Sequence, residues 1–233
     1  MNKYLLMLTV GKESKSILNI TWKEAFSTKS FTIKFVVGWA LLITILALYP
    51  YYFAYIQQRQ GVLLNDWLLA AIPPTDLSGL VFGIIAVTTL LGLWRTLQSP
   101  YLFLVLLWGY LFLNISRVIT IFLVPLEPPV GLMTMTDPLA FPFYGQGGNI
   151  NKDLFYSGHT GTIFLLYLVL QKKWEKRIAL AFTVLIGILL LVQHIHYTID
   201  VLCAPVFVYF LYIWAKKLSH HQIYENHLVN KGL

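Results

Sequence analysis

The chain has 233 residues, of which 58% are hydrophobic and only 12% are charged, and its mean hydropathy is +0.68. This apolar surface is more than a soluble core could bury. The composition therefore excludes an ordinary soluble protein and indicates an integral membrane protein. The formal charge of +7 does not indicate nucleic-acid binding, because the lysines and arginines lie mainly in short stretches beside the apolar runs.

The first 32 residues form a segment that we expect in the cytoplasm. Leu18, Trp22 and Phe26 recur at four-residue spacing with lysines among them, which predicts a helix lying on the cytoplasmic membrane surface. A solvated tail explains the same residues equally well.

Six apolar runs of spanning length follow, and they predict an all-α integral membrane domain of six transmembrane helices over residues 33–216. We expect the spans at 33–56, 78–98, 101–125, 154–171, 178–194 and 196–215. An even number of spans puts both termini on one side of the membrane. Residues 217–233 are then a tail on that side.

The basic residues indicate which side that is. Of the 17 lysines and arginines, only Arg59, Arg117 and Lys152 fall on the side opposite to the termini. The positive-inside rule therefore predicts cytoplasmic termini. The connections after spans one, three and five then face the outer or lumenal leaflet.

Polar groups capable of chemistry gather on this outer side. His196 and Asp200 are four residues apart, so on a helix they share one face and the carboxylate can accept a hydrogen bond from the imidazole. Such a bond fixes the tautomer, leaves the other ring nitrogen as nucleophile or base, and stabilises the positive charge that develops on reaction. The alternative is that Asp200 is a helix-capping aspartate near a structural histidine.

A second histidine, His159, follows Ser157 and Gly158 at the predicted start of the fourth span. Backbone N–H groups at a helix N-terminus attract phosphate oxygens, glycine permits close approach, and a hydroxyl adds a donor. Arg117, near the end of the third span, offers a planar guanidinium for phosphate oxygens. Together these groups predict phosphoryl transfer without an obligatory metal.

Two motifs resemble the active-site motifs of the sphingomyelin synthase branch of the type 2 phosphatidic acid phosphatase (PAP2) superfamily. "KDLFYSGHT" resembles the first, Asp-x3-Ser-Gly-His-Thr, and "HYTID" resembles the second, His-Tyr-Thr-x-Asp. The matching residues are Asp153, Ser157, Gly158, His159 and Thr160, followed by His196, Tyr197, Thr198 and Asp200. "SRVITIFLVPLEPP" is similar to a further segment of the branch, with Arg117, Ile119 and Thr120 in register and the prolines shifted.

The resemblance implies a PAP2-like helical bundle and a role for each motif residue. His196 would form a phosphohistidine, Asp200 would orient it, and His159 would protonate the departing lipid oxygen and then activate the acceptor. The residues expected to bind the substrate phosphate are Arg117, Ser157, Gly158 and Thr160. Asp153 and Tyr197 would support the site from positions beside it.

His194 lies two residues from His196, so on a continuous helix its ring would point elsewhere, and a supporting or structural role is favoured over catalysis. His159, His194, His196 and Asp200 are residue types that can bind a metal ion, so a metal site is a further possibility. The resemblance nevertheless implies no metal and no cofactor.

Two departures from the family pattern bear on the reaction. The branch usually has Cys-Gly before the first aspartate, where this chain has Asn151 and Lys152, which points to a different acceptor region. The phosphatases of the superfamily usually have Ser-Arg seven and six residues before the second histidine, where this chain has Leu189 and Leu190. That absence favours the synthase branch and leaves Arg117 as the main guanidinium group.

We therefore expect an enzyme that moves a phosphate-bearing head group from a phospholipid to a lipid alcohol such as ceramide, with membrane lipids as its partners. A lipid phosphate phosphatase, which uses the same intermediate with water as acceptor, is the alternative. A non-catalytic lipid-binding or transport protein is the third hypothesis, and the intact set of His159, His196 and Asp200 argues against it.

Overall fold

The structure, a computed structural model, describes residues 20–133 and 150–220. Within these ranges the chain is helical, apart from the connections and one isolated parallel bridge between Val62 and Leu126. Leu18 of the expected surface helix and the tail beyond residue 220 lie outside the described residues.

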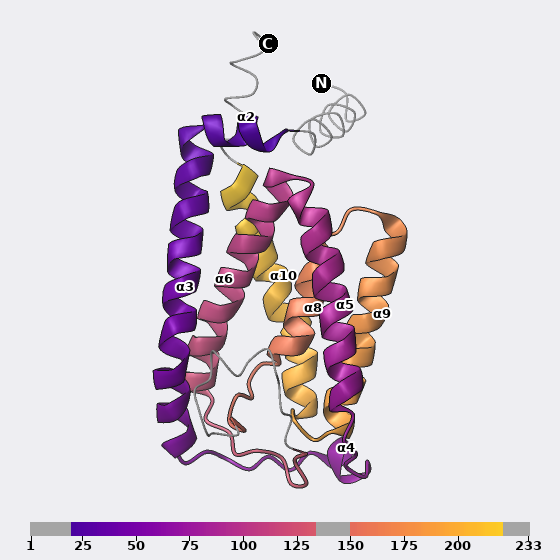
Figure 1. The fold of residues 1–233 in the computed structure, drawn as a ribbon. Coiled ribbons are helices and arrows are strands. Elements are labelled where there is room, and N and C mark those ends of the chain that lie inside the picture. The colour runs from indigo at the N-terminus through magenta and orange to yellow at the C-terminus, as the bar shows by residue number, and fades with distance from the viewer. Residues whose placement is uncertain (1–19, 134–149, 221–233) are drawn as a thin grey trace, which may run out of the picture.

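Five long helices and one shorter helix lie side by side as a bundle (Figure 1). They are α3 (Lys29–Gln58), α5 (Ser78–Leu97), α6 (Pro100–Leu123), α8 (Gly158–Val169), α9 (Lys173–Val192) and α10 (Thr198–His220). The short helices α2 (Trp22–Ser27) and α4 (Trp67–Ala70) lie at opposite ends of the bundle. Helix α10 packs on α6 and α8, α8 packs on α9, and α3 packs on α6.

Each expected span overlaps one of these six helices, but length and composition qualify only four of them to cross a membrane: α3, α5, α6 and α10. Helix α8 has 12 residues and is therefore roughly 18 Å long. Helix α9 has 20 residues, but its first turns carry Lys173, Glu175, Lys176 and Arg177. Six crossings therefore stay a prediction.

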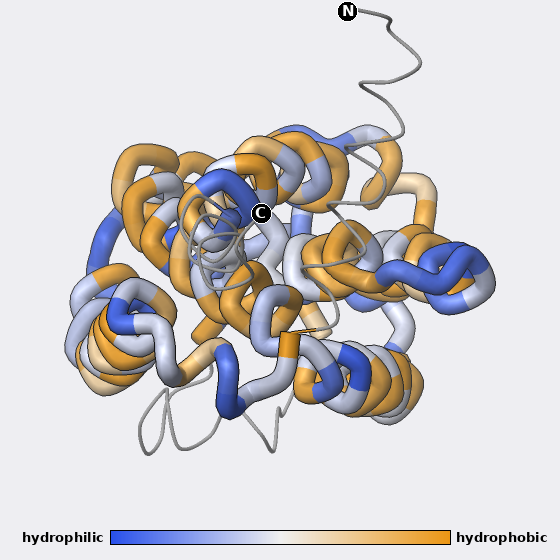
Figure 2. The backbone as a smooth tube through the Cα atoms, turned by 90° about the horizontal axis from the view of Figure 1, so that it is seen from above, coloured by the Kyte–Doolittle hydropathy of each residue, from blue (hydrophilic) through white to orange (hydrophobic). Residues whose placement is uncertain are grey.

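The outer surface of the bundle is apolar. Leu90 is 68% exposed, Leu202 64% and Trp214 60%, whereas Phe31, Leu104 and Ile163 are fully buried in the core. Seen from above, the helices of the bundle are rich in hydrophobic residues, with hydrophilic residues at several helix ends and connections (Figure 2). Water does not favour so many exposed large apolar side chains, so the surface supports an integral membrane protein.

The end of the bundle at α2 is held by contacts between distant parts of the chain. The indole N–H of Trp22 donates to the Leu97 carbonyl at 2.8 Å, and the Lys34 ammonium donates to the Leu218 carbonyl at 2.7 Å. The start of α3 and the end of α10 thus lie at this end, so α10 begins at the other. A membrane-surface role for α2 stays a prediction.

Two boundaries differ from the sequence prediction in ways that shape the site. The fourth span was expected from residue 154, but residues 154–157 are not helical and α8 begins at Gly158. The carbonyl of Phe155 instead accepts a hydrogen bond from the Thr120 hydroxyl at 2.9 Å. Buried non-helical backbone is tolerated at membrane depth when protein groups satisfy it in this way.

The connection between α9 and α10 is the second difference. We expected His196 inside the sixth span, on a helix shared with Asp200. Helix α10 instead begins at Thr198, and His194 in the connection has a φ of 55°. His196 therefore lies just before the helix, where its position depends on side-chain contacts rather than on helical backbone bonds.

Candidate active site

His196 and Asp200 are in contact, as the sequence predicts. His196 Nδ1 lies 3.3 Å from Asp200 Oδ2, and the two side chains are almost fully buried. No hydrogen bond from Nε2 of this ring to a described residue is found. The carboxylate therefore fixes one ring nitrogen and leaves the other available for reaction.

Asp200 also caps its own helix. The same atom, Oδ2, accepts the backbone N–H of Tyr197 at 3.0 Å, which satisfies a donor at the start of α10. Oδ1 is buried and has no hydrogen-bond partner among the described residues. The orienting and capping interpretations of Asp200 are thus compatible, because one oxygen makes both contacts.

The start of α8 lies against the start of α10. The backbone N–H of Ser157 donates to the Asp200 carbonyl at 3.1 Å, and His159 is the second residue of α8. The Ser157 hydroxyl accepts the Thr160 N–H at 3.4 Å and donates to the Thr160 hydroxyl at 3.1 Å. Both hydroxyls are buried and serve as a helix cap, and their binding of a phosphate stays a prediction.

Arg117 reaches the same region from α6. It is 6% exposed, its Nε donates to the Tyr156 carbonyl at 3.0 Å, and its Nη2 forms an ion pair with Asp153. A Cβ added to Gly158 would lie 2.5 Å from Nη1 of Arg117. Gly158 therefore makes room for the guanidinium, which brings a positive charge to the N-terminus of α8.

Asp153 was expected beside the site, and the structure gives it a definite partner. Its carboxylate is 36 residues from Arg117 in sequence but holds Nη2 of that residue. A buried guanidinium without a carboxylate would be costly, so the pair stabilises the cation inside the bundle. Sequence reasoning missed this pairing because no local pattern joins the two residues.

His194 and Tyr197 hold the α9–α10 connection to other outer segments. The ring nitrogens of His194 lie 2.7 Å from the Val130 carbonyl oxygen and 2.9 Å from the Ile72 carbonyl oxygen. The Tyr197 hydroxyl donates to the Glu127 carbonyl at 2.9 Å and accepts the Leu64 N–H at 3.3 Å. These contacts tie the connection to neighbouring segments, and a supporting role of His194 in the site stays a prediction.

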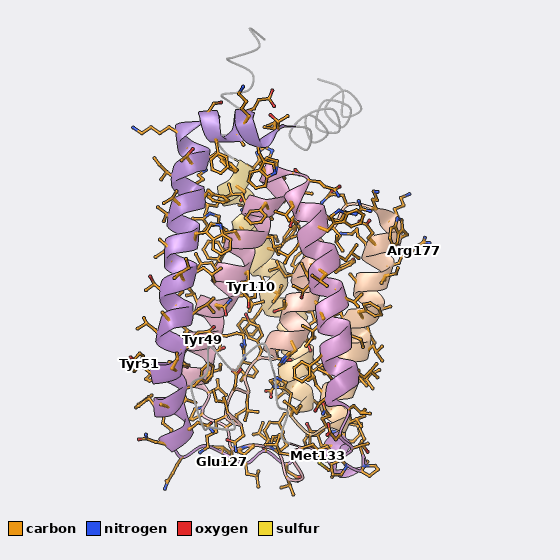
Figure 3. All side chains as sticks on the ribbon, viewed as in Figure 1. Tyr49, Tyr51, Tyr110, Glu127, Met133 and Arg177 are labelled. Carbon is orange, nitrogen blue, oxygen red and sulfur yellow. The ribbon has the colours of Figure 1, made fainter. Side chains whose placement is uncertain are left out.

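Two tyrosines of α3 also form hydrogen bonds to α6 inside the bundle. The Tyr49 hydroxyl donates to Asn114 Oδ1, and the Tyr52 hydroxyl donates to the Val118 carbonyl at 2.7 Å. Tyr49 is 4% exposed, whereas Tyr51 is 76% exposed and points away from the bundle (Figure 3). Neither Tyr49 nor Asn114 was predicted to belong to the site, although an asparagine within an apolar span is itself a signal.

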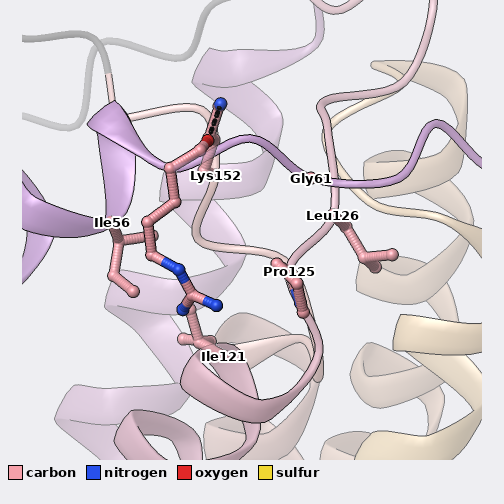
Figure 4. A pocket seen from close by; sticks show the side chains of 7 residues that line it. Ile56, Gly61, Ile121, Pro125, Leu126 and Lys152 are labelled. Atoms are coloured by element: carbon pink, nitrogen blue, oxygen red, sulfur yellow. Dashed lines mark hydrogen bonds between the residues drawn. The ribbon is translucent and has the colours of Figure 1, made fainter.

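The other two outer basic residues, Arg59 and Lys152, line a small pocket between the ends of α3 and α6 (Figure 4). Its volume is about 10 Å³, room for one water molecule at most. Arg59 donates to the Phe122 carbonyl at 2.9 Å, and Lys152 bonds to the Arg59 carbonyl and to Glu127. Both cations therefore stabilise C-terminal helix ends.

Among the described residues no three histidine, cysteine or carboxylate side chains lie close enough together to hold a metal ion. The arrangement can nevertheless supply an oriented imidazole, a second histidine at a helix N-terminus and a buried guanidinium. These are the parts of a nucleophilic phosphoryl-transfer site.

The architecture and the site define a helical membrane protein with a histidine–carboxylate centre. Residues 152–218 match the family model described as PAP2 superfamily C-terminal, which supports membership of that superfamily. The match covers less than a third of the chain, includes both histidine motifs and leaves Arg117 outside. It indicates a lipid-related function of the phosphatase or phosphotransferase type. Comparison with curated proteins and with solved structures gave no match.

Proposed function

We propose that the protein is a membrane-embedded lipid phosphotransferase of the sphingomyelin synthase type. It moves a phosphate-bearing head group from a phospholipid to a lipid alcohol such as ceramide. The observation that carries the proposal is the contact of His196 Nδ1 with Asp200 Oδ2 at 3.3 Å, which leaves Nε2 without a described partner. An imidazole held in this way is prepared to attack phosphorus.

The reaction proceeds in two displacements at phosphorus. In the first, His196 Nε2 forms a bond to phosphorus, the bond to the glycerolipid oxygen breaks, and His159 gives that oxygen a proton. In the second, His159 takes the proton of the acceptor hydroxyl, the new oxygen–phosphorus bond forms, and the nitrogen–phosphorus bond breaks. Asp200 stabilises the positive imidazole in between, and Arg117 supplies positive charge for the phosphate oxygens.

The replacement of the phosphatase Ser-Arg pair by Leu189 and Leu190 favours a lipid acceptor over water. His196 is 2% exposed and Asp200 is fully buried, so the site has to open to admit either acceptor to the nucleophile. A phosphatase reaction is the second candidate, because the family match is compatible with either acceptor. The site begins at the end of the bundle opposite to α2, which we assign to the outer or lumenal leaflet.

The acceptor distinguishes these functions directly. Purified protein in detergent is incubated with a phospholipid that carries ³²P in its phosphate, with and without ceramide. We expect label in a new ceramide product only when ceramide is present. Label released into water in both reactions identifies a phosphatase, and label that stays in the donor in both identifies a lipid-binding protein and overturns the proposal.

A further inference from the structure

His196 needs support from outside its own helix. It lies in the connection between α9 and α10, two residues before the first helical residue, Thr198. Whatever fixes the backbone at Thr198 therefore fixes where the His196 ring lies relative to Asp200.

Asp66 makes that contact from another part of the chain. The backbone N–H of Thr198 donates to Asp66 Oδ2 at 2.7 Å, and the Thr198 hydroxyl donates to Oδ1 at 3.1 Å. Oδ1 also accepts the N–H groups of Leu68 at 3.1 Å and Leu69 at 3.3 Å, at the start of α4. One carboxylate thus joins the start of α4 to the start of α10.

Two carboxylates therefore hold two successive N–H groups beside the nucleophile. Asp200 accepts the N–H of Tyr197, and Asp66 accepts the N–H of Thr198. The first comes from α10 itself, whereas the second is 132 residues away in sequence. Of the two carboxylates, only Asp66 joins the start of α10 to the segment between α3 and α5. Tyr197 and His194 also contact that segment, through Leu64 and Ile72, but neither contact is at Thr198.

Asp66 is charged at neutral pH. Burial acts to raise its pKa, but the hydrogen bonds from Thr198, Leu69 and Leu68 outweigh burial and hold the pKa below its usual range. A charged acceptor makes stronger hydrogen bonds than a neutral one, and a negative charge is favoured at a helix N-terminus.

We propose that Asp66 is a positioning residue for His196. By holding Thr198, it keeps Nδ1 of His196 against Asp200 and keeps Nε2 directed at the phosphorus of the substrate. The proposal rests on the phosphotransferase function. We expect Asp66 to affect kcat rather than substrate binding, because its described contacts are with Leu68, Leu69 and Thr198 and not with the residues proposed to bind the phosphate.

The test compares Asp66→Ala with a matched control, Asp76→Ala. Asp76 lies in the same segment, caps α5 through Ser78 and accepts a hydrogen bond from Gln193 of the same connection at 3.1 Å. It makes no described contact with residues 196–200. Both variants lose one capping carboxylate, but only one loses the contact at Thr198.

For Asp66→Ala we expect kcat to fall by about 10- to 100-fold with KM within about twofold, because small misplacements of a reacting group are costly. Asp76→Ala should keep kcat within about threefold at a similar melting temperature. Thr198→Val removes only the hydroxyl bond and should lose about two- to fivefold. Equal losses of kcat in the Asp66 and Asp76 variants would mean a merely structural role and overturn the proposal.

A second measurement does not depend on turnover. Diethyl pyrocarbonate modifies histidines, and mass spectrometry gives the rate at each one. We expect modification of His196, which is 2% exposed, to be at least about fivefold faster in Asp66→Ala than in the parent and in Asp76→Ala, because a released turn exposes the ring. The exposed His220 serves as the internal reference. Unchanged His196 reactivity contradicts the proposal, whereas a parent protein inactive with every donor contradicts the phosphotransferase function instead.

Discussion

Asp200 is the residue on which the candidate chemistry depends most directly. Its Oδ2 contacts both His196 Nδ1 and the Tyr197 N–H, so a simple deletion would remove an orienting group and a helix cap together. A substitution that keeps one acceptor and removes the charge separates the two roles.

Asp200→Asn is that substitution. The amide oxygen can still accept the Tyr197 N–H, but a neutral amide cannot stabilise the positive charge on His196. In a Ser-His-Asp site the same change lowers turnover roughly 10⁴-fold. We expect turnover to fall by about 10²- to 10⁴-fold here. Head-group transfer at saturating donor measures it.

Melting in detergent provides the control for this variant. Asp200→Asn should melt close to the parent, whereas Asp200→Ala should melt lower because the cap is lost as well. If Asp200→Asn keeps more than about a tenth of the parent rate, the orienting role is wrong and only the capping role stands. Asp153→Asn is unsuitable as a silent comparison, because Asp153 holds Arg117.

Gly158 carries the second prediction at this scale. An alanine Cβ there would lie 2.5 Å from Nη1 and 2.6 Å from Cζ of Arg117, whose guanidinium is held by Asp153 and the Tyr156 carbonyl. Gly158→Ala should therefore displace the guanidinium and lower kcat/KM by about 100-fold or more. The contact at 2.5 Å is far closer than real Cβ contacts allow, so a variant with parent activity would refute this account of Arg117.

Gly83→Ala is the matched control for Gly158→Ala. Gly83 lies in α5, and a Cβ there would meet nothing within 4 Å. Alanine is the better helix former, so this variant should keep full activity and melt no lower than the parent.

The residue scale also shows what the sequence could predict of the site. The contact of His196 with Asp200 follows from local spacing, and the structure contains it. Ser157, expected only to bind the substrate phosphate, caps α8 through Thr160, a role that was not predicted. The contacts of Arg117 with Asp153 and of Asp66 with Thr198 join residues 36 and 132 positions apart. Such pairs depend on tertiary packing, which spacing along a single chain does not encode.

Among the elements, the helices were predicted more reliably than their ends. All six apolar runs overlap a described helix, because hydrophobicity over a long window is a strong signal. The sequence placed the start of α8 four residues too early and extended α9 and α10 through the connection. Apolar composition does not distinguish helix from buried irregular backbone, whose carbonyls here bond to Thr120 and Arg117.

The outer segments are linked by a contact that depends on pH. Glu127 accepts hydrogen bonds from the Lys152 ammonium at 2.9 Å and the Gly61 N–H at 2.8 Å. These bonds and the charge of Lys152 lower the pKa of Glu127 below its usual range. The folded pKa lies below the unfolded one, so the contribution to stability is complete above the unfolded pKa of about 4.3 and is lost as the pH falls through the folded value.

We therefore predict that the amides of Gly61 and Val62 are better protected from hydrogen exchange at pH 6 than at pH 3. Protection here is the intrinsic exchange rate at each pH divided by the measured rate. Glu127→Gln should abolish that additional protection, because its side chain has no charge to lose. Hydrogen exchange followed by mass spectrometry of the 59–66 peptide measures both. If protection depends on pH equally in the parent and in Glu127→Gln, the charge of Glu127 contributes nothing to the pH dependence of this contact.

The whole molecule has a strong asymmetry of charge between its two ends. The α2 end carries the start of α3, the corner between α5 and α6, the start of α9 and the end of α10, where most of the described lysines and arginines lie (Figure 1). The opposite end carries Arg59 and Lys152, each bonded to backbone carbonyls. Glu127 and Met133 lie at that end too (Figure 3). This distribution favours a cytoplasmic location for α2.

The number of crossings is open to one decisive measurement. Helices α8 and α9 form a hairpin that enters from the end where α10 begins, and its tip carries Lys172, Lys173, Lys176 and Arg177. If the hairpin crosses completely, the protein has six spans. If the tip stops inside the membrane, it has four spans and a re-entrant hairpin.

We predict that the tip reaches the cytoplasm, because four cations within the six residues 172–177 are too costly to hold in hydrocarbon. Single cysteines are introduced at Lys173, at exposed Thr75 and at exposed Ser27, in a background in which the native Cys203 is serine. A membrane-impermeant maleimide should label Thr75→Cys in intact cells, and should label Lys173→Cys and Ser27→Cys only after the membrane is opened. The background protein should stay unlabelled. If opened membranes allow labelling of Ser27→Cys but not of Lys173→Cys, the protein has four spans and the tip of the hairpin is buried. If Ser27→Cys is labelled in intact cells, the orientation is reversed and His196 lies in the cytoplasmic leaflet.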